Sequence, residues 1–182
     1  MKKIYVLLLI LLSIAFIFLY YRAVKNNPTV HSDGTIEYNF TKQSQANASR
    51  KLYKYVLKDL NKSEKEIQSF ARITPKTISA FEADLNGDDK KEIIGVVFST
   101  LYMGSTGYSL FILEEKNNDL DDIVYQINFE PIKQFYILPN KTNGYKDIKI
   151  YGSSAYNFEP MVIRYNKHFY YNTKQDILFK NK

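Results

Sequence analysis

The most strongly hydrophobic part of the pattern is the beginning of the chain. Residues 4–21 form a run without a charged side chain, and basic residues stand on both sides of it. At about 1.5 Å per residue, this run gives roughly 27 Å of helix, which is close to the hydrocarbon thickness of a bilayer. The pattern predicts a transmembrane signal anchor over residues 1–22, and with it the membrane as a partner.

A signal peptide that is removed by cleavage is the alternative interpretation. Such a peptide has an apolar stretch of about 7–15 residues, followed by a cleavage site of the small-x-small type. Residues 20–25 offer no such site, which favours the uncleaved anchor. Since a first helix after a short N-terminal tail normally places the following chain outside, we expect a single-pass membrane protein with an extracytoplasmic domain. After cleavage, the domain would instead be secreted or periplasmic.

Two helical segments follow a polar stretch. The first has apolar residues spaced by three or four, which lie on one face of a helix: Ala48, Leu52, Tyr55, Val56 and Leu60. Ser44 stands at a position suited to capping this helix. Ser63 and Glu66 match a capping box at the start of a second helix, and Pro75 is expected to end the helical region.

From residue 77 onward the pattern changes to short β-branched and aromatic runs, separated by Asn, Gly and Pro turn signals. These runs predict strands at residues 77–83, 92–99, 108–113, 122–128, 134–138, 147–151, 161–165 and 168–172, with a further short strand at 35–40. Residues 93–98 are nearly all apolar, which predicts a central strand covered on both faces. Helices followed by strands indicate an α+β fold, with two short helices packed on an antiparallel β-sheet meander.

The chain of 182 residues is about the size of a single domain. The predicted organisation is a transmembrane signal anchor at 1–22, a juxtamembrane linker at 23–43, an α+β globular domain at 44–174 and a C-terminal tail at 175–182.

Composition and charge exclude several kinds of site. The chain has no Cys, which excludes disulfides, Cys-ligated zinc and a thiol nucleophile, and its two His residues argue against a multi-histidine metal site. The net charge is +6, and basic residues concentrate in residues 42–76. This stretch has two interpretations, a surface for anionic lipid or glycan, and a solvated helix face. Nucleic acid is not expected as a partner because of the anchor.

Residues 84–92 form the segment with the most distinctive chemistry. Side chains that carry oxygen stand at positions one, three, five and nine of this loop, and calcium is a hard cation that prefers six to eight oxygen ligands. In a tight loop alternate side chains converge on one centre, while position seven turns its carbonyl inward. The predicted ligands are therefore the side chains of Asp84, Asn86, Asp88 and Glu92 and the backbone oxygen of Lys90.

At these residues the sequence resembles the calcium loops of FG-GAP and VCBS-type domains, in which a D-x-N-x-D-G-x-x-[DE] loop leads directly into an apolar strand. Residues 93–97 supply that strand, and residues 143–148 and 165–170 resemble a later turn and the final hairpin of such domains. The resemblance implies a single stand-alone domain of the cell envelope with a structural Ca²⁺ ion. A propeller of several blades is excluded by length, since only one loop is present.

The loop departs from the family pattern at its sixth position. Asp89 stands where the family has Gly at positive φ, a conformation that Asp and Asn tolerate better than other residues. A polar β-turn without an ion is therefore the alternative to a calcium site. Residues 114–122 form another acidic stretch, which is either a second cation patch or a solvated hairpin loop.

The absence of a recognisable catalytic set in the sequence favours a non-enzymatic binding domain. Its partner would be a protein or glycan of the cell envelope, bound by a loop or by an aromatic face. The aromatic residues considered for such a face, with the core as their alternative location, are Tyr102, Tyr108, Tyr151, Tyr156 and Tyr170. Two further functions remain open. One is an inhibitor or immunity-type protein against a cell-wall-targeting enzyme, and the other is a cation-assisted hydrolase using Asp84, Asp88 and Glu92.

Overall fold

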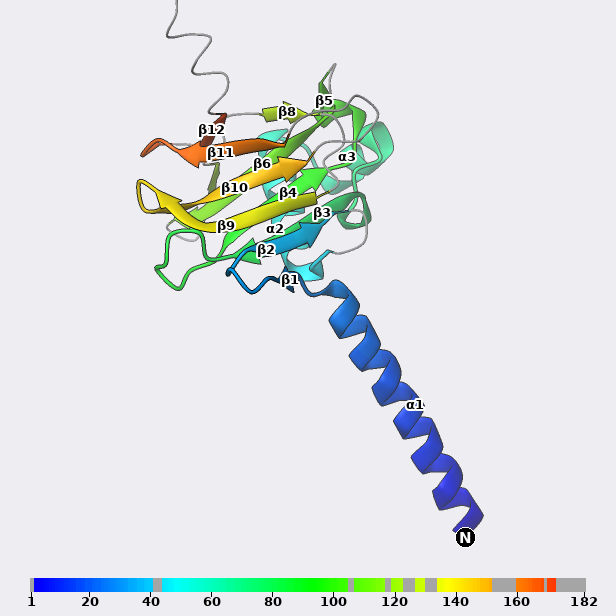
Figure 1. The fold of residues 1–182 in the computed structure, drawn as a ribbon. Coiled ribbons are helices and arrows are strands. Elements are labelled where there is room, and N and C mark those ends of the chain that lie inside the picture. The colour runs from blue at the N-terminus through cyan, green and yellow to red at the C-terminus, as the bar shows by residue number, and fades with distance from the viewer. Residues whose placement is uncertain are drawn as a thin grey trace, which may run out of the picture.

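Three helices precede most of the strands in the computed structural model (Figure 1). It describes residues 2–40, 44–104, 107–116, 119–122, 127–129, 134–151, 160–168 and 170–172, so the predicted tail at 175–182 lies outside the described residues. The helices are α1 (Lys2–Asn26), α2 (Ala46–Asp59) and α3 (Glu64–Ala71), with the short 3₁₀ helices η1 (Pro75–Thr77) and η2 (Thr100–Tyr102). The architecture is α+β with antiparallel sheets.

The strands form two antiparallel sheets rather than the one predicted. Sheet A has the order β1-β2-β9-β10-β11-β12. Its strands are β1 (Thr29–Val30), β2 (Ile36–Asn39), β9 (Gln134–Thr142), β10 (Tyr145–Tyr151), β11 (Met161–Tyr165) and β12 (Tyr170–Asn172). Residues 36–39, expected as a strand within a linker, therefore belong to a sheet, and Tyr38 and Phe40 are buried in the core.

Sheet B lies between sheet A and the helices. It has the order β3-β4-β6-β5, and β7 and β8 also pair with β6. Its strands are β3 (Ile78–Ala83), β4 (Glu92–Val97), β5 (Met103–Gly104), β6 (Gly107–Lys116), β7 (Asp119–Asp122) and β8 (Ile127–Phe129). Every residue of β4 is buried, which confirms the prediction of a central strand.

Two hydrophobic clusters explain this layering, because successive side chains of a strand point to opposite faces. Ile94 and Val96 of β4 belong to the cluster between the two sheets, which also contains Phe135 and Ile148 of sheet A. Ile93 and Val97 face the other way, toward α2 and α3. Since the residues of both clusters lie between positions 38 and 170, the core is contained within residues 27–182.

The predicted transmembrane helix is wrong. Among the residues that the structure describes, no helix is both long and apolar enough to cross a membrane. The side chains of residues 5–20 of α1 are exposed. In Figure 1, α1 projects away from the two sheets.

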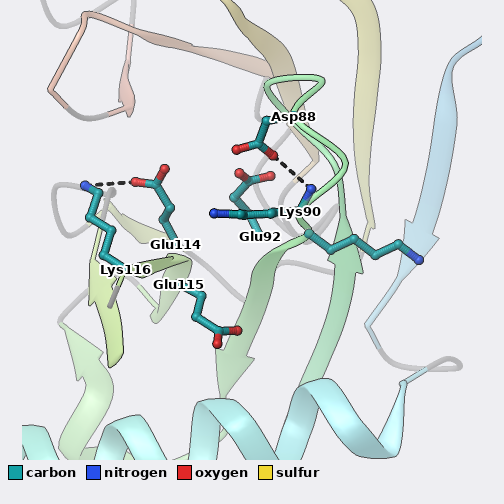
Figure 2. Close-up of a pocket in the computed structure, with 7 residues that line it drawn as sticks. Asp88, Lys90, Glu92, Glu114, Glu115 and Lys116 are labelled. Carbon is teal, nitrogen blue, oxygen red and sulfur yellow. Dashed lines mark hydrogen bonds and ion pairs between the residues drawn. The ribbon is translucent and has the colours of Figure 1, made fainter. Parts of the chain in front are cut away.

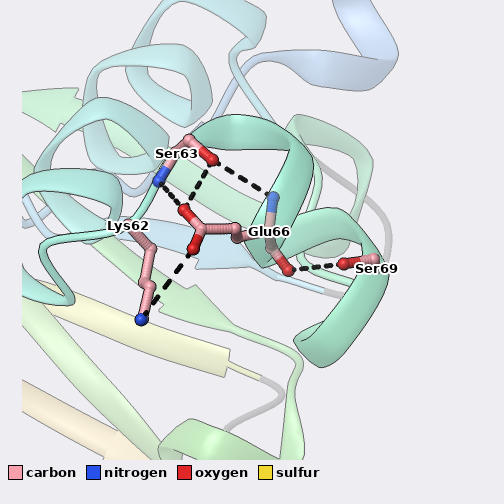
Figure 3. A network of polar contacts seen from close by, with 4 residues as sticks. All are labelled: Lys62, Ser63, Glu66 and Ser69. Carbon is pink, nitrogen blue, oxygen red and sulfur yellow. Dashed lines mark hydrogen bonds and ion pairs between the residues drawn. The ribbon is translucent and has the colours of Figure 1, made fainter.

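The N-termini of α2 and α3 are capped in different ways. The capping box at α3 is confirmed: the N–H of Glu66 donates to Ser63 Oγ, and the N–H of Ser63 donates to the Glu66 carboxylate (Figure 3). The predicted Ser44 cap is wrong, because Gln45 is the N-cap residue of α2. Ser44 Oγ instead accepts from the N–H of Ala80, on the edge strand β3. The end of α3 was also predicted too late, since Arg72 terminates it with φ +53° before Pro75.

Candidate functional site

The 84–92 loop joins two neighbouring strands of sheet B. β3 ends at Ala83 and β4 begins at Glu92, and these two residues are paired across the hairpin. Asp84 therefore leaves one strand at the point where Glu92 enters the other. The antiparallel pairing holds both ends of the loop close together, so the loop conformation is anchored by regular structure on both sides.

Three polar side chains of the loop accept hydrogen bonds from its own backbone. Asp84 accepts from the N–H of Gly87 at 2.5 Å, Asn86 accepts from the N–H of Asp88 at 2.9 Å, and Asp88 accepts from the N–H of Lys90 at 2.9 Å. The N–H of Gly87 is the main cause that lowers the pKa of Asp84. The side chains of Asp84, Asn86 and Asp88 therefore bond to the backbone of the loop, and their convergence on one ion stays a prediction.

The turn needs positive φ at two positions. Gly87 has φ +89°, and Asp89, the residue at position six, has φ +65°. The positive φ expected at Asp89 is confirmed. A Cβ at residue 87 would also lie 2.9 Å from the Nζ of Lys141, so Gly87 provides room for this ammonium group.

Glu92 is the buried carboxylate of the loop. The residue is 2% exposed, and its Oε2 accepts a hydrogen bond from the N–H of Leu85 at 2.8 Å. The pKa of Glu92 is raised to about 7, chiefly by burial and also by the negative charges of Asp88 and Asp84, against the lowering effect of the Leu85 N–H. A carboxyl group with this pKa is poised to lose its proton when a cation approaches.

Two lysines from sheet A hold the outer side of the loop. Lys141 Nζ donates to the carbonyl of Asn86 at 2.7 Å, and Lys146 Nζ donates to the carbonyl of Asp84 at 3.1 Å. The backbone N–H of Lys146 also donates to the carbonyl of Leu85 at 2.8 Å. The loop is therefore fastened to the β9–β10 hairpin, and through it to the second sheet.

A hollow of about 360 Å³ opens beside the loop (Figure 2). Its lining residues are Asp88, Lys90, Lys91, Glu92, Glu114, Glu115 and Lys116. Figure 2 shows the carboxylates of Asp88 and Glu92 next to one another. Glu114 and Glu115, predicted in a separate acidic stretch, instead lie at the end of β6 and line the same hollow.

Tyr145 connects the loop to Glu114. Its hydroxyl accepts from Asn86 Nδ2 at 3.4 Å and donates to the Glu114 carboxylate at 3.2 Å. The other oxygen of Glu114 forms an ion pair with Lys116 at 2.9 Å. The register of β4 and β6, in which Ile93 pairs with Leu113, brings Glu114 to the strand position opposite Glu92.

The structure thus brings Asp88 and Glu92 together at the hollow, while the carboxylate of Asp84 turns toward the loop backbone. Within the described part of the chain, no group of three or more His, Asp or Glu side chains is arranged to hold a metal ion. Sequence reasoning missed the roles of Lys141, Tyr145 and Lys146. No local pattern reveals them, because each lies more than fifty positions away from the loop residue that it contacts.

Comparisons with known proteins add no relative. No family model, no curated protein and no solved structure matches the chain. The similarity to FG-GAP and VCBS-type calcium loops therefore stays a prediction from the residues of the loop.

Proposed function

We propose that this chain is a non-enzymatic binding domain whose 84–92 loop takes up a calcium ion. The observation that carries the proposal is the pairing of Asp88 with the buried Glu92 at the edge of one hollow. Burial is the main cause of the raised pKa of Glu92, and the charge of Asp88 adds to it, because two carboxylates held together repel each other when both are ionised. A divalent cation would remove this repulsion.

The donor set favours calcium over other metals. The loop offers carboxylate, amide and carbonyl oxygens and contains no His, and oxygen ligands of this kind suit hard cations. The proposed ligands are the side chains of Asp84, Asn86, Asp88 and Glu92 and the carbonyl of Lys90. A bound ion would neutralise the carboxylates and stiffen the β3–β4 connection. The aromatic or loop surface that meets an envelope protein or glycan would then rest on a firmer sheet.

Thermal unfolding of residues 27–182 with millimolar calcium or with chelator tests the ion. Binding stabilises the folded state by about 2.7 kcal/mol when calcium exceeds Kd a hundredfold. For a domain of this size, the melting temperature should rise by roughly 5–10 °C. Asp88→Asn and Glu92→Gln should each remove most of this rise.

The matched control is Glu64→Gln, which removes one negative charge from the exposed surface of α3. This variant should keep the full calcium-dependent rise. Identical melting curves in calcium and in chelator would contradict the proposal and leave residues 84–92 as an ordinary polar turn held by Lys141 and Lys146.

We also infer that the domain works outside the cytoplasm, with α1 as its export segment. The side chains of residues 5–20 belong to neither core cluster, and Lys2 and Lys3 precede the apolar run, as in export signals. Calcium modules outside cells bind in the range of roughly 10⁻⁴ to 10⁻³ M, so a single loop suffices there. Protease added to intact cells or spheroplasts should digest the domain, and protection until lysis would contradict export.

A cation-assisted hydrolase is a second candidate, favoured by the hollow itself. It gathers carboxylates from the loop and from β6, and Glu92 has a pKa near the working pH of a general acid or base. Hydrolysis of model esters and glycosides that depends on calcium and is lost in Glu92→Gln would favour the enzyme. Full calcium binding without any hydrolysis across such a panel would favour the binding domain.

A further inference from the structure

Residues 44–77 form the helical layer of the fold. The excess of positive charge in the chain is concentrated in this layer and in the residues just before it. Residues 42–76 contain nine basic and three acidic residues, and this excess equals the net charge of +6 of the entire chain. The rest of the sequence is therefore neutral in sum. Seven basic residues of the layer are exposed: Arg50, Lys54, Lys58, Lys62, Lys65, Arg72 and Lys76.

The three acidic groups of this layer accept hydrogen bonds from neighbouring residues, and that of Glu64 accepts from Gln68 Nε2 at 3.0 Å. Asp59 accepts a hydrogen bond from the hydroxyl of Tyr102 at 2.8 Å. The carboxylate of Glu66 accepts from both the N–H and the hydroxyl of Ser63, and it lies 4.0 Å from Lys62 (Figure 3). Because the basic residues of this stretch outnumber the acidic ones by six, the layer carries a predominantly positive charge.

An apolar hollow of about 400 Å³ interrupts this basic surface. Its lining residues are Leu60, Lys62, Glu66, Ile67, Ser69, Phe70 and Leu101. Phe70 is 80% exposed and Leu101 is 43% exposed. Outside α1, Val30 is the other large hydrophobic side chain exposed among the described residues. The capping box fixes the first turn of α3 and thereby the position of Phe70 on the next turn.

We propose that the helical layer docks on the surface of an anionic phospholipid membrane. Phe70 and Leu101 enter the headgroup region, and the exposed basic residues contact lipid phosphates. The exposed side chains of Phe70 and Leu101 together with the basic surface favour a membrane as the partner. Transfer of the two apolar side chains out of water is favourable, and the positive charge is attracted to anionic headgroups. This docking uses α2, α3 and η2, and it is independent of the calcium loop between β3 and β4.

Vesicle co-sedimentation of residues 27–182 tests the proposal. This fragment contains both core clusters and lacks α1, whose exposed apolar side chains would bind lipid on their own. It should sediment with vesicles of phosphatidylcholine containing about 30% phosphatidylglycerol, and not with phosphatidylcholine alone. Salt at about 0.5 M should release it, because screening weakens exposed charges.

Two pairs of variants locate the contact. Lys62→Gln with Lys65→Gln should lower the partition onto anionic vesicles about 25-fold, since each charge near such a surface contributes about a fivefold factor. Phe70→Ser should lower it about tenfold or more. The matched pair Lys149→Gln with Lys167→Gln removes the same charge from sheet A and its β11–β12 turn, and it should change binding less than about threefold.

Equal losses in the two lysine pairs would overturn the proposal, because they would reveal only attraction by net charge. Sedimentation that does not depend on phosphatidylglycerol would also overturn it. If the fragment does not sediment with anionic vesicles at all, the proposal is wrong, and the basic surface belongs to an acidic protein instead. Far-ultraviolet circular dichroism of each variant checks that the fold is intact.

Discussion

At the scale of single residues, burial of Glu92 links the stability of the fold to pH. Its pKa of about 7 in the folded chain exceeds the usual value of 4.5, so the folded state binds more protons between these values than the unfolded state does. The free energy of unfolding contributed by this group therefore falls as pH rises through this window.

Glu92→Gln removes this dependence while keeping an oxygen that can accept from Leu85. Without calcium, the variant should be more stable than the wild type by about 1–3 kcal/mol at pH 8, and the two should converge near pH 4. Denaturant unfolding in metal-free buffer across this range measures the difference. A difference of the same size at every pH would show that Glu92 does not titrate in this window.

The backbone conformation of Asp89 leads to a second prediction at the scale of single residues. Its φ of +65° strains a residue with a Cβ, and Ala lacks the polar side chain that helps Asp tolerate this region. Asp89→Gly should therefore be about 1 kcal/mol more stable than Asp89→Ala. Denaturant unfolding of both variants measures this order. Asp89→Gly should also keep or strengthen the calcium-dependent rise in melting temperature.

At the scale of elements, the packing of α2 on β4 depends on one glycine. A Cβ at Gly95 would lie 2.5 Å from Cδ2 of Leu52 and 2.8 Å from Cβ of Ala80. Gly95 therefore lets the helix approach the central strand closely. This close approach explains how α2 and the buried strand share one tightly packed cluster with Ile93 and Val97.

Gly95→Ala should lower the free energy of unfolding by about 1–3 kcal/mol, because the added methyl group overpacks the contact. Leu52→Ala alone should cost about 2–5 kcal/mol through the cavity that it leaves. The double variant should cost less than the sum, since each change relieves part of the other. Additive losses in denaturant unfolding would mean that the two residues are not in contact.

At the scale of the whole molecule, the two sheets and the helical layer form a unit without α1. Both hydrophobic clusters lie within residues 27–182, and the side chains of residues 5–20 of α1 are exposed. Removal of residues 1–26 should therefore change the melting temperature by less than about 2 °C, well below the shift expected for the loss of core contacts. Scanning calorimetry in mild detergent compares the two chains, and failure of the shorter one to fold would contradict this division.

The tertiary structure alone decided the separation into two sheets and the surroundings of the calcium loop. Most strand segments were predicted from β-branched and aromatic runs, but the pairing of β2 with β9 joins residues about one hundred positions apart. Likewise, Lys141, Tyr145 and Glu114 reach the loop because the β9–β10 hairpin packs over it and β6 pairs with β4. The hydrophobic periodicity indicates which face of a strand is buried, but it does not indicate which element packs against that face.

The sequence by itself determined the features that depend on neighbours within a few positions. The capping box of Ser63 and Glu66 and the contacts of Asp84 and Asn86 with the loop backbone arise from hydrogen bonds that span two to three residues. The positive φ at Asp89 belongs to the same local turn. Burial of Glu92 is different, because its residue type favours solvent and only the layers around β4 remove it from water. The conformation of the loop could therefore be predicted from local chemistry. The raised pKa of Glu92 and the hollow beside the loop depend instead on contacts across both sheets.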